Sequence, residues 1–114
     1  MENCLFCSMV AGKIPVTKVY EDELVLAFRD IAPQAPTHVL VIPKTHLSGM
    51  AEADQADPAV LAACLRACAI VARQEAIEQT GYRIVSNVGA DACQSVPHLH
   101  FHVLGGRKMS DSMA

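Results

Sequence analysis

Three of the five histidines in the chain fall at alternate positions of one short apolar stretch, His98-Leu99-His100-Phe101-His102-Val103-Leu104. Residues i, i+2 and i+4 of a β-strand project from the same face, so a strand would align the three imidazoles about 6.6 Å apart. The intervening Leu99, Phe101 and Val103 would then face the core. The spacing therefore predicts a strand over residues 98–104 with a row of histidines on one side.

A histidine row can simply be solvated, because an exposed neutral imidazole, with a pKa of roughly 6.5, costs little. Three neighbouring imidazoles, however, disfavour one another's protonation and titrate as a coupled set. Such a row offers a neutral nucleophile, several N–H donors and a path for protons, which attack on a phosphorus centre requires. We therefore expect the row to act on a phosphorylated ligand.

Length and composition limit the classes of protein to consider. With 114 residues, of which 52% are hydrophobic, the chain is expected to form a single domain over residues 1–114. The formal net charge of −3 and the lack of a Lys/Arg cluster argue against nucleic-acid and anionic-membrane partners. No apolar run approaches about 18 residues and no leader pattern is present, so we expect a cytoplasmic protein. Five cysteines, an odd number, favour free thiols or a metal site over a disulfide framework.

The histidine row needs a scaffold, and the rest of the sequence predicts an α+β fold. A short helix is expected from Cys4 to Ala11, ended by Gly12 and Pro15. Strands are predicted over residues 16–20, 24–29, 38–43, 82–87 and 98–104. The continuous apolar run of residues 38–43 favours a central strand buried on both faces, whereas the two prolines of residues 30–37 indicate a loop.

One long helix is predicted to begin with Asp57 as N-cap and Pro58 at its first position, and to end at Gly81. Its apolar face is expected to comprise Leu61, Cys64, Leu65, Cys68, Val71 and Ala72. Cys64 and Cys68 lie one turn apart on this face, so we interpret them as core thiols.

Three segments, in this order, closely resemble the histidine triad superfamily: residues 28–38 (FRDIAPQAPTH), 42–46 (IPKTH) and 94–107 (QSVPHLHFHVLGGR). The match is to the nucleotide-binding branch that hydrolyses adenosine 5′-phosphoramidates, and it runs from Cys4 to Met109. The resemblance implies a five-stranded antiparallel sheet with one long helix and a short N-terminal helix. It also implies a homodimer in which two such sheets join.

The resemblance also assigns roles in catalysis. His100, the middle histidine, matches the nucleophile that attacks the α-phosphorus, expels an amine and leaves a nucleotidyl-histidine that water hydrolyses. His102 would hold a phosphate oxygen, His98 and His38 would orient the row and relay protons, and Ser95 would contact the leaving group. The implied activity is purine nucleoside 5′-phosphoramidate hydrolysis, extending to acyl-adenylates, on AMP or GMP derivatives.

A second group of matching residues implies nucleotide binding. Asp30 matches an acidic residue that accepts the ribose hydroxyls, as a carboxylate suits a sugar diol. Phe28 and Ile31 would flank the base, Asn87 would contact the phosphate or ribose, and Gln94 would complete the set. From the residues alone, Asp30 is better interpreted as capping a turn.

The sequence departs from the family pattern in two places. Cys93 stands where close relatives have glycine, so the backbone there is expected not to take a positive φ or to approach the phosphate as closely. The tail Ser110-Asp111-Ser112-Met113-Ala114 replaces a tail containing Trp-Pro-Pro. Because of this different tail, the sequence does not show which leaving group the substrate carries, but the implied reaction is the same.

Cys4 and Cys7 form a Cys-x-x-Cys pair. Some members of the superfamily bind zinc through such a pair with the histidines that match His46 and His98, and these four ligands would close a tetrahedral site. A short helix that turns Leu5 and Cys7 toward the core explains the pair equally well. We expect catalysis to need no metal and favour a metal-free protein, with the zinc site as the alternative.

Three other functions compete with the phosphoramidase. They are a dinucleoside polyphosphate hydrolase with the same histidine row, a nucleotide-binding interaction module with incidental activity, and a zinc-binding structural protein. The Gln94-Ser95 pair and the Gly105-Gly106-Arg107 ending favour the phosphoramidase branch over the first.

Overall fold

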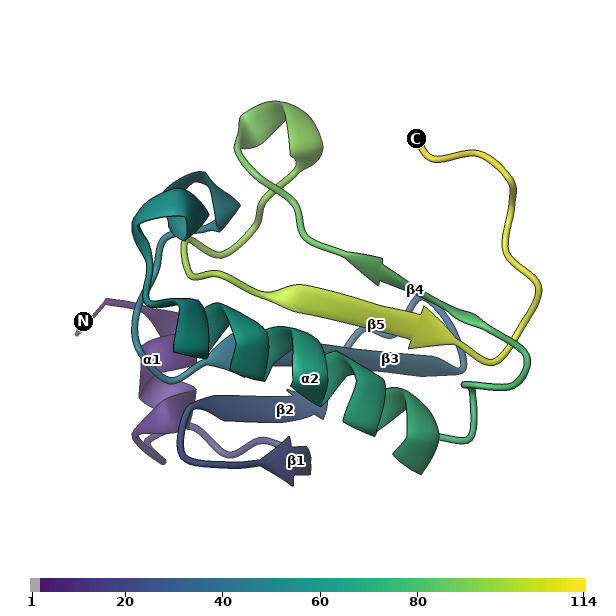
Figure 1. The fold of residues 1–114 in the computed structure, drawn as a ribbon, viewed down its shortest axis with the longest axis horizontal. Helices are drawn as coiled ribbons and strands as arrows, with labels where there is room; N and C mark the ends of the chain where they lie inside the picture. Colours follow the sequence, from purple (N-terminus) through teal and green to yellow (C-terminus); the bar gives the residue numbers. More distant parts are fainter. Residues whose placement is uncertain (1–2) are drawn as a thin grey trace.

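The computed structural model describes residues 3–114, which form one five-stranded antiparallel sheet in the order β1-β2-β3-β5-β4 (Figure 1). The elements in chain order are α1 (Leu5–Val10), β1 (Lys18–Glu21), β2 (Val25–Arg29), β3 (Thr37–Pro43), α2 (Pro58–Gln74), β4 (Tyr82–Val85) and β5 (Phe101–Gly105). Short 3-10 helices cover Met50–Gln55 and Ala90–Ala92. This confirms the predicted α+β fold. Among the described residues, no helix combines the length and apolar character that crossing a membrane requires.

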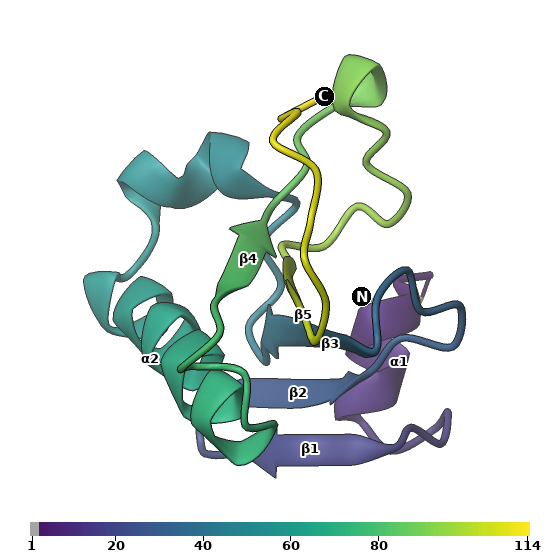
Figure 2. The same cartoon turned by 90° about the vertical axis from the view of Figure 1, so that its right-hand side faces the viewer.

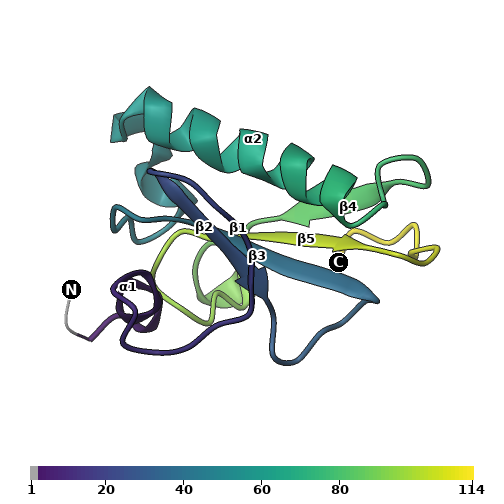
Figure 3. The same cartoon turned by 90° about the horizontal axis from the view of Figure 1, so that it is seen from below.

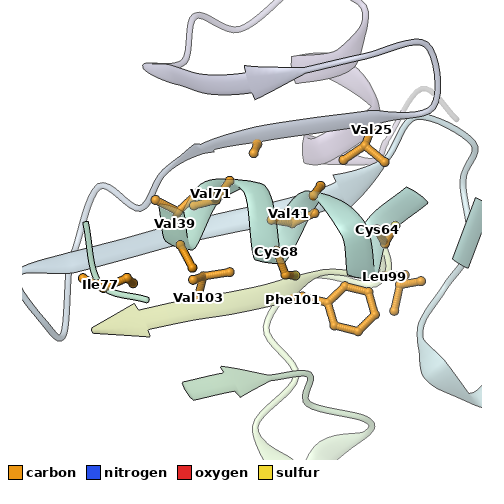
Figure 4. Packing of buried hydrophobic residues seen from close by; sticks show 13 residues of the cluster. Val25, Val39, Val41, Cys64, Cys68, Val71, Ile77, Leu99, Phe101 and Val103 are labelled. Carbon is orange, nitrogen blue, oxygen red and sulfur yellow. The ribbon is translucent and has the colours of Figure 1, made fainter. Parts of the chain in front are cut away.

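The two helices lie on opposite faces of the sheet (Figures 2 and 3). The long helix α2 covers one face, and its buried side chains pack with those of the strands in the larger core cluster, shown in Figure 4. The short helix α1 covers the other face, where Cys4 and Phe6 pack with Leu26, Phe28, Leu40 and Ile42. Each face of the sheet is thus buried by a different helix.

Strand β3 lies at the centre of the sheet, and all seven of its residues are buried. Val39 and Val41 belong to the cluster under α2, whereas Leu40 and Ile42 belong to the cluster under α1. The prediction of a central strand buried on both faces is confirmed, because successive side chains of a strand point to opposite faces.

Helix α2 begins as predicted, with the Asp57 side chain accepting a hydrogen bond of 2.9 Å from the Ala59 N–H. Cys64 and Cys68 are buried core thiols, and desolvation raises the pKa of Cys64 to about 12 and that of Cys68 to about 11. The placement of Leu65 on the apolar face is wrong, since this side chain is 55% exposed. The buried stripe instead runs through Val60, Cys64, Ala67, Cys68, Val71 and Ala72.

The predicted end of this helix at Gly81 is also wrong, since α2 ends at Gln74. Ala76 adopts a left-handed conformation with φ of 58°, which stops the helix. The Ile77 N–H then bonds the Ala72 carbonyl at 3.0 Å, and the Ile77 side chain is buried. A buried apolar side chain just past a left-handed residue is typical of a helix C-terminus, and no glycine is needed here.

The other boundaries differ from the predictions by a few residues. The strand predicted to begin at His98 begins at Phe101 instead, because Val41, which pairs with Phe101, is the last residue of β3 that pairs with β5. Before that point the Leu99 N–H bonds the carbonyl of Leu47 instead, at 2.6 Å. In α1, Phe6 is the buried residue, whereas Leu5 is 44% exposed, so the expectation that Leu5 turns toward the core is wrong.

Candidate active site and metal centre

A cavity of about 490 Å³ lies on the α1 side of the sheet. Apolar side chains line one part of it, and the other part is lined by the triad histidines His100 and His102 together with Ser95 and Asp30. The apolar part includes Phe6, Met9, Val16, Phe28, Ile31 and Leu40. An apolar recess beside a few convergent polar groups is the usual form of a small-molecule site. Asn87 and Gln94, also predicted to bind nucleotide, are not among the described residues that line this cavity.

His100 is held in one tautomer by the backbone. Its Nδ1 atom lies 2.7 Å from the carbonyl oxygen of His98. A carbonyl only accepts, so Nδ1 carries the proton and, in the neutral ring, Nε2 keeps a free lone pair. The ring is 3% exposed and packs edge-on against Phe6, with centroids 5.2 Å apart. In its neutral form, His100 therefore presents an oriented nitrogen lone pair to the cavity.

His102 is held by a second chain of hydrogen bonds. The Gln34 N–H donates to His38 Nδ1 at 3.0 Å, so the proton of neutral His38 resides on Nε2. That Nε2–H lies 2.8 Å from His102 Nδ1, and His102 accordingly carries its own proton on Nε2. His102 therefore presents an N–H donor beside the His100 ring.

Burial keeps this histidine pair neutral. Desolvation, with smaller contributions from neighbouring His100 and His38, lowers the pKa of His102 to about 4. Desolvation also lowers the pKa of His38, although the nearby Asp30 carboxylate opposes the shift. Both rings are therefore uncharged near neutral pH and serve as hydrogen-bonding groups with fixed directions.

Asp30 serves the loop and the cavity at once. One carboxylate oxygen, Oδ1, accepts a hydrogen bond of 2.8 Å from the Ala32 N–H, which confirms the interpretation of Asp30 as a turn cap. The other oxygen, Oδ2, lies 3.4 Å from His38 Nε2. Since Asp30 also lines the cavity, the turn cap leaves it able to accept hydrogen bonds from a ligand.

The segment before Ser95 is fixed by the side chain of Gln94. Its amide donates to the carbonyls of Ser48 and Val96, at 2.8 and 3.1 Å, and its oxygen accepts from the Gly89 N–H at 3.0 Å. Cys93, next to it, adopts a left-handed conformation with φ of 60°. The expectation that a cysteine here prevents a positive φ is wrong, because a single L residue can take this conformation at a cost of about 1–2 kcal/mol. Backbone hydrogen bonds from the Cys93 N–H to the Ala90 carbonyl and from the Gln94 N–H to the Gly89 carbonyl, at 3.0 and 3.1 Å, hold the turn in place.

Four side chains whose donor atoms could hold a metal ion converge near Phe6, which also packs edge-on against His98. The Nδ1 atom of His98 lies 3.2 Å from Cys4 Sγ, 3.6 Å from Cys7 Sγ and 3.1 Å from His46 Nδ1. Cys7 Sγ lies 3.3 Å from His46 Nδ1. We call these four residues, Cys4, Cys7, His46 and His98, the Cys/His cluster.

The sequence profile of the HIT domain family matches residues 11–109. The chain belongs to the HIT domain family. It is 51% identical over 108 residues to a 14 kDa zinc-binding protein of Zea mays, covering 93% of this chain and 84% of the relative. It is 38% identical over 113 residues to the purine nucleoside phosphoramidase of Escherichia coli K12, covering 99% and 95%. A HIT family hydrolase from Clostridium thermocellum, 41% identical, has the same fold, with a TM-score of 0.96 over 100% of this chain and 99% of that one.

The Cys/His cluster of this HIT domain has the dimensions of a tetrahedral zinc site. Bond lengths of about 2.3 Å to sulfur and 2.0–2.1 Å to nitrogen place neighbouring S and N ligands about 3.6 Å apart, and two N ligands about 3.3 Å apart. The observed separations of 3.1 to 3.6 Å are close to these values. His98 Nε2 lies 2.9 Å from the Pro43 carbonyl and therefore carries the proton, which leaves the Nδ1 lone pair directed at the cluster. The donor set thus fits zinc.

A second group in the HIT domain, Asp30, His38 and His102, has donor atoms equally close together but does not fit a metal. A metal on His38 Nε2 would require the proton to move to Nδ1. The Gln34 N–H already points at Nδ1, at 3.0 Å, and two N–H groups cannot face each other without cost. His38 and His102 are therefore joined by a hydrogen bond, with the Asp30 carboxylate 3.4 Å from His38 Nε2.

The sequence alone did not reveal several groups that shape the HIT domain site. The carbonyls of His98 and Pro43 and the N–H of Gln34 set the three histidine tautomers. These are backbone groups, so no residue type marks them. Phe6 packs against both His98 and His100. The one feature of the sequence that could have drawn attention to Phe6 is its position between the two cysteines of the Cys-x-x-Cys pair.

Proposed function

We propose that this HIT domain hydrolyses purine nucleoside 5′-phosphoramidates, and acyl-adenylates as well, in two steps through a nucleotidyl-histidine. The observation that carries the proposal is the His100 tautomer, since the bond from Nδ1 to the His98 carbonyl leaves Nε2 unprotonated beside the cavity. The identity to a purine nucleoside phosphoramidase supports the choice of substrate class.

In the first step, His100 Nε2 forms a bond to the α-phosphorus as the bond from phosphorus to the amine nitrogen breaks. The ring becomes a cation, and the His98 carbonyl, 2.7 Å from Nδ1–H, stabilises that charge. His102 Nε2–H donates to a phosphoryl oxygen, where negative charge develops. The leaving amine takes one proton from solvent through the hydroxyl of Ser95, which lines the cavity.

In the second step, water attacks the phosphorus and the bond from phosphorus to His100 Nε2 breaks. The water gives up one proton to solvent, which balances the proton used in the first step. The products are the nucleoside monophosphate, the amine and neutral His100. Because the imidazole leaves as a neutral ring, it is a good leaving group, and the intermediate splits one difficult hydrolysis into two easier steps.

The cavity provides a place for each part of the nucleotide. The purine packs in the apolar part, between Phe28 and Ile31, where the fully exposed Ile31 side chain stands at the mouth. The ribose hydroxyls donate to Asp30. Asn87 and Gln94 are outside this lining, so we assign Gln94 to holding the segment that carries Ser95.

Single-turnover incubation with a radiolabelled adenosine phosphoramidate tests the proposal, with mass analysis of the intact protein under neutral conditions. We expect a mass increase of one nucleotidyl group on wild-type protein and none on His100→Ala. Diadenosine triphosphate serves as the second substrate. Faster turnover of that compound would favour the dinucleoside polyphosphate hydrolase, and AMP binding without turnover would favour a binding module.

We also propose that the Cys/His cluster binds zinc, which reverses the preference for a metal-free protein. The fitting separations, the lone pair of His98 Nδ1 and the similarity to a zinc-binding protein support this. Four protein ligands leave no open position, so the metal would be structural and would tie α1 to the sheet. Elemental analysis of protein purified without a metal column tests the proposal. The homodimer and the cytoplasmic location remain predictions, and light scattering in solution checks the first.

A further inference from the structure

Arg107 lies two residues beyond the end of β5, and the loop of residues 30–37 leads into the start of β3. Gly105 pairs with Thr37 across these two strands. The guanidinium of Arg107 donates a hydrogen bond of 3.0 Å from Nη2 to the carbonyl of Gln34, 73 residues away in sequence. Arg107 thus connects the end of the histidine strand to the loop that precedes His38.

The preceding glycine makes this contact possible. Gly106 has φ of 96°, a conformation that L side chains rarely adopt. A Cβ atom at this position would lie 2.8 Å from Pro36 Cβ, which is closer than carbon atoms approach. The chain can therefore turn tightly around Pro36 and bring the next residue within reach of Gln34.

The residue that Arg107 holds belongs to the hydrogen-bonded chain of the active site. The carbonyl of Gln34 accepts from Arg107, and the N–H of Gln34 donates to His38 Nδ1 at 3.0 Å. His38 Nε2–H then lies 2.8 Å from His102 Nδ1. Gln34 is itself exposed, in a loop with two prolines, and these two backbone bonds are the ones that the structure describes for it.

We propose that Arg107 is a positioning residue for catalysis, which fixes the tautomer of His38 through the Gln34 backbone. With Arg107 in place, the Gln34 N–H stays on His38 Nδ1, the His38 proton stays on Nε2, and His102 keeps its own proton on the side of the cavity. Without it, the loop is free to turn the Gln34 N–H away, and His38 can place its proton on either nitrogen. The catalytic part of this inference rests on the proposed phosphoramidase function.

Arg107→Ala in the full chain tests the inference, with Arg83→Ala as the matched control. Arg83 is also an arginine that donates to a backbone carbonyl, that of Ser110 at 3.0 Å, but Ser110 has no described link to the histidines. We expect Arg107→Ala to lower kcat about three- to tenfold, the usual worth of one such hydrogen bond, with a smaller change in KM. Arg107→Lys, which retains a donor, should recover most of kcat, and Arg83→Ala should match wild type.

Nitrogen-15 NMR of the histidine rings gives a readout that does not depend on turnover. In wild-type protein, His38 should show an unprotonated Nδ1 and a protonated Nε2, and in Arg107→Ala both signals should move toward the average of the two tautomers. Unchanged His38 signals in a folded Arg107→Ala protein would overturn the inference, whatever its activity. A shifted tautomer in a protein that proves inactive on phosphoramidates would leave the link to His38 standing and contradict only the proposed function.

Discussion

The backbone carbonyl of His98 lies 2.7 Å from the Nδ1 atom of His100, while the imidazole of the same His98 faces the Cys/His cluster. One residue therefore orients the proposed nucleophile with its main chain and belongs to the proposed zinc site with its side chain. The two sites are adjacent, but a change to the His98 ring and a change to the His98 backbone should have different effects.

His100→Ala should abolish turnover, because no neighbouring group can form the covalent intermediate. The expected loss in kcat is several powers of ten, whereas AMP binding should weaken only modestly, since the ring is one of several contacts. Steady-state kinetics and calorimetry with AMP measure the two quantities. Retention of more than a few per cent of wild-type kcat would contradict the assignment of His100 as the nucleophile.

Asp30→Asn should raise KM for ribonucleotide substrates far more than for their 2′-deoxy analogues. Asparagine keeps an oxygen that can accept from the Ala32 N–H, so the turn is preserved, but the second acceptor for the ribose diol is lost. The measurement is KM for matched ribose and deoxyribose phosphoramidates. Equal losses on both sugars would mean that Asp30 only shapes the loop.

Cys4→Ser combined with Cys7→Ser should remove the metal and lower the melting temperature. We expect about one zinc per chain in wild-type protein, because a closed site uses four protein ligands, and much less than one in the variant. Catalysis should largely survive, since the metal contacts no reacting group. Cys93→Ser, which changes an exposed thiol outside the cluster, is the control and should alter neither quantity. Stoichiometric zinc in the double variant would exclude the Cys/His cluster as the site.

Stability should decrease as the pH falls from about 6.5 toward 4. Burial lowers the pKa of His102 to about 4, whereas its ordinary value is 6.5. Between these values the unfolded chain binds a proton that the folded chain does not, so acid favours unfolding. Urea unfolding across this range measures the slope, and His102→Gln should flatten it. The same slope in His102→Gln as in wild type would show that other groups are responsible.

Ala76→Gly should stabilise the protein. Ala76 is exposed and has φ of 58°, so its methyl group strains the backbone without burying surface. Relief of the left-handed conformation, partly offset by the greater freedom of glycine in the unfolded chain, gives an expected gain of about 0.5–1 kcal/mol. Chemical denaturation checks this value. Ala76→Val, in which a β-branched side chain must take the same φ, is expected to be less stable than wild type.

The sequence predicted those features that depend on local periodicity. The alternation of residues 98–104 placed Leu99, Phe101 and Val103 in the core, and they lie in the core cluster under α2. It also placed the histidines on the opposite side, although the regular strand begins only at Phe101. The start of α2 followed from Asp57 and Pro58, because capping is a matter of a few adjacent residues.

Features that depend on contacts between distant parts of the chain were harder to predict from the sequence. The end of α2 at Gln74 is set by the burial of Ile77 in the core, which only the tertiary fold supplies. His46 and His98 are 52 residues apart, and nothing local shows that their Nδ1 atoms lie 3.1 Å from each other. The tautomers are set by backbone groups, so residue types carry no information about them.

Helix α1 has six residues, and a helix of this length does not persist in water without tertiary support. Yet it supplies one wall of the proposed nucleotide cavity through Phe6 and Met9 and carries Cys7 of the Cys/His cluster. The cavity can therefore be completed only after the sheet has formed, because α1 needs the sheet to pack against. In reverse, we expect detachment of α1 to cost less free energy than global unfolding, so that the pocket is lost while the rest of the domain stays folded. Nucleotide affinity should accordingly disappear on heating before the sheet melts. A metal that joins Cys4 and Cys7 to His46 and His98 would bring the temperature at which affinity is lost closer to the melting temperature of the sheet.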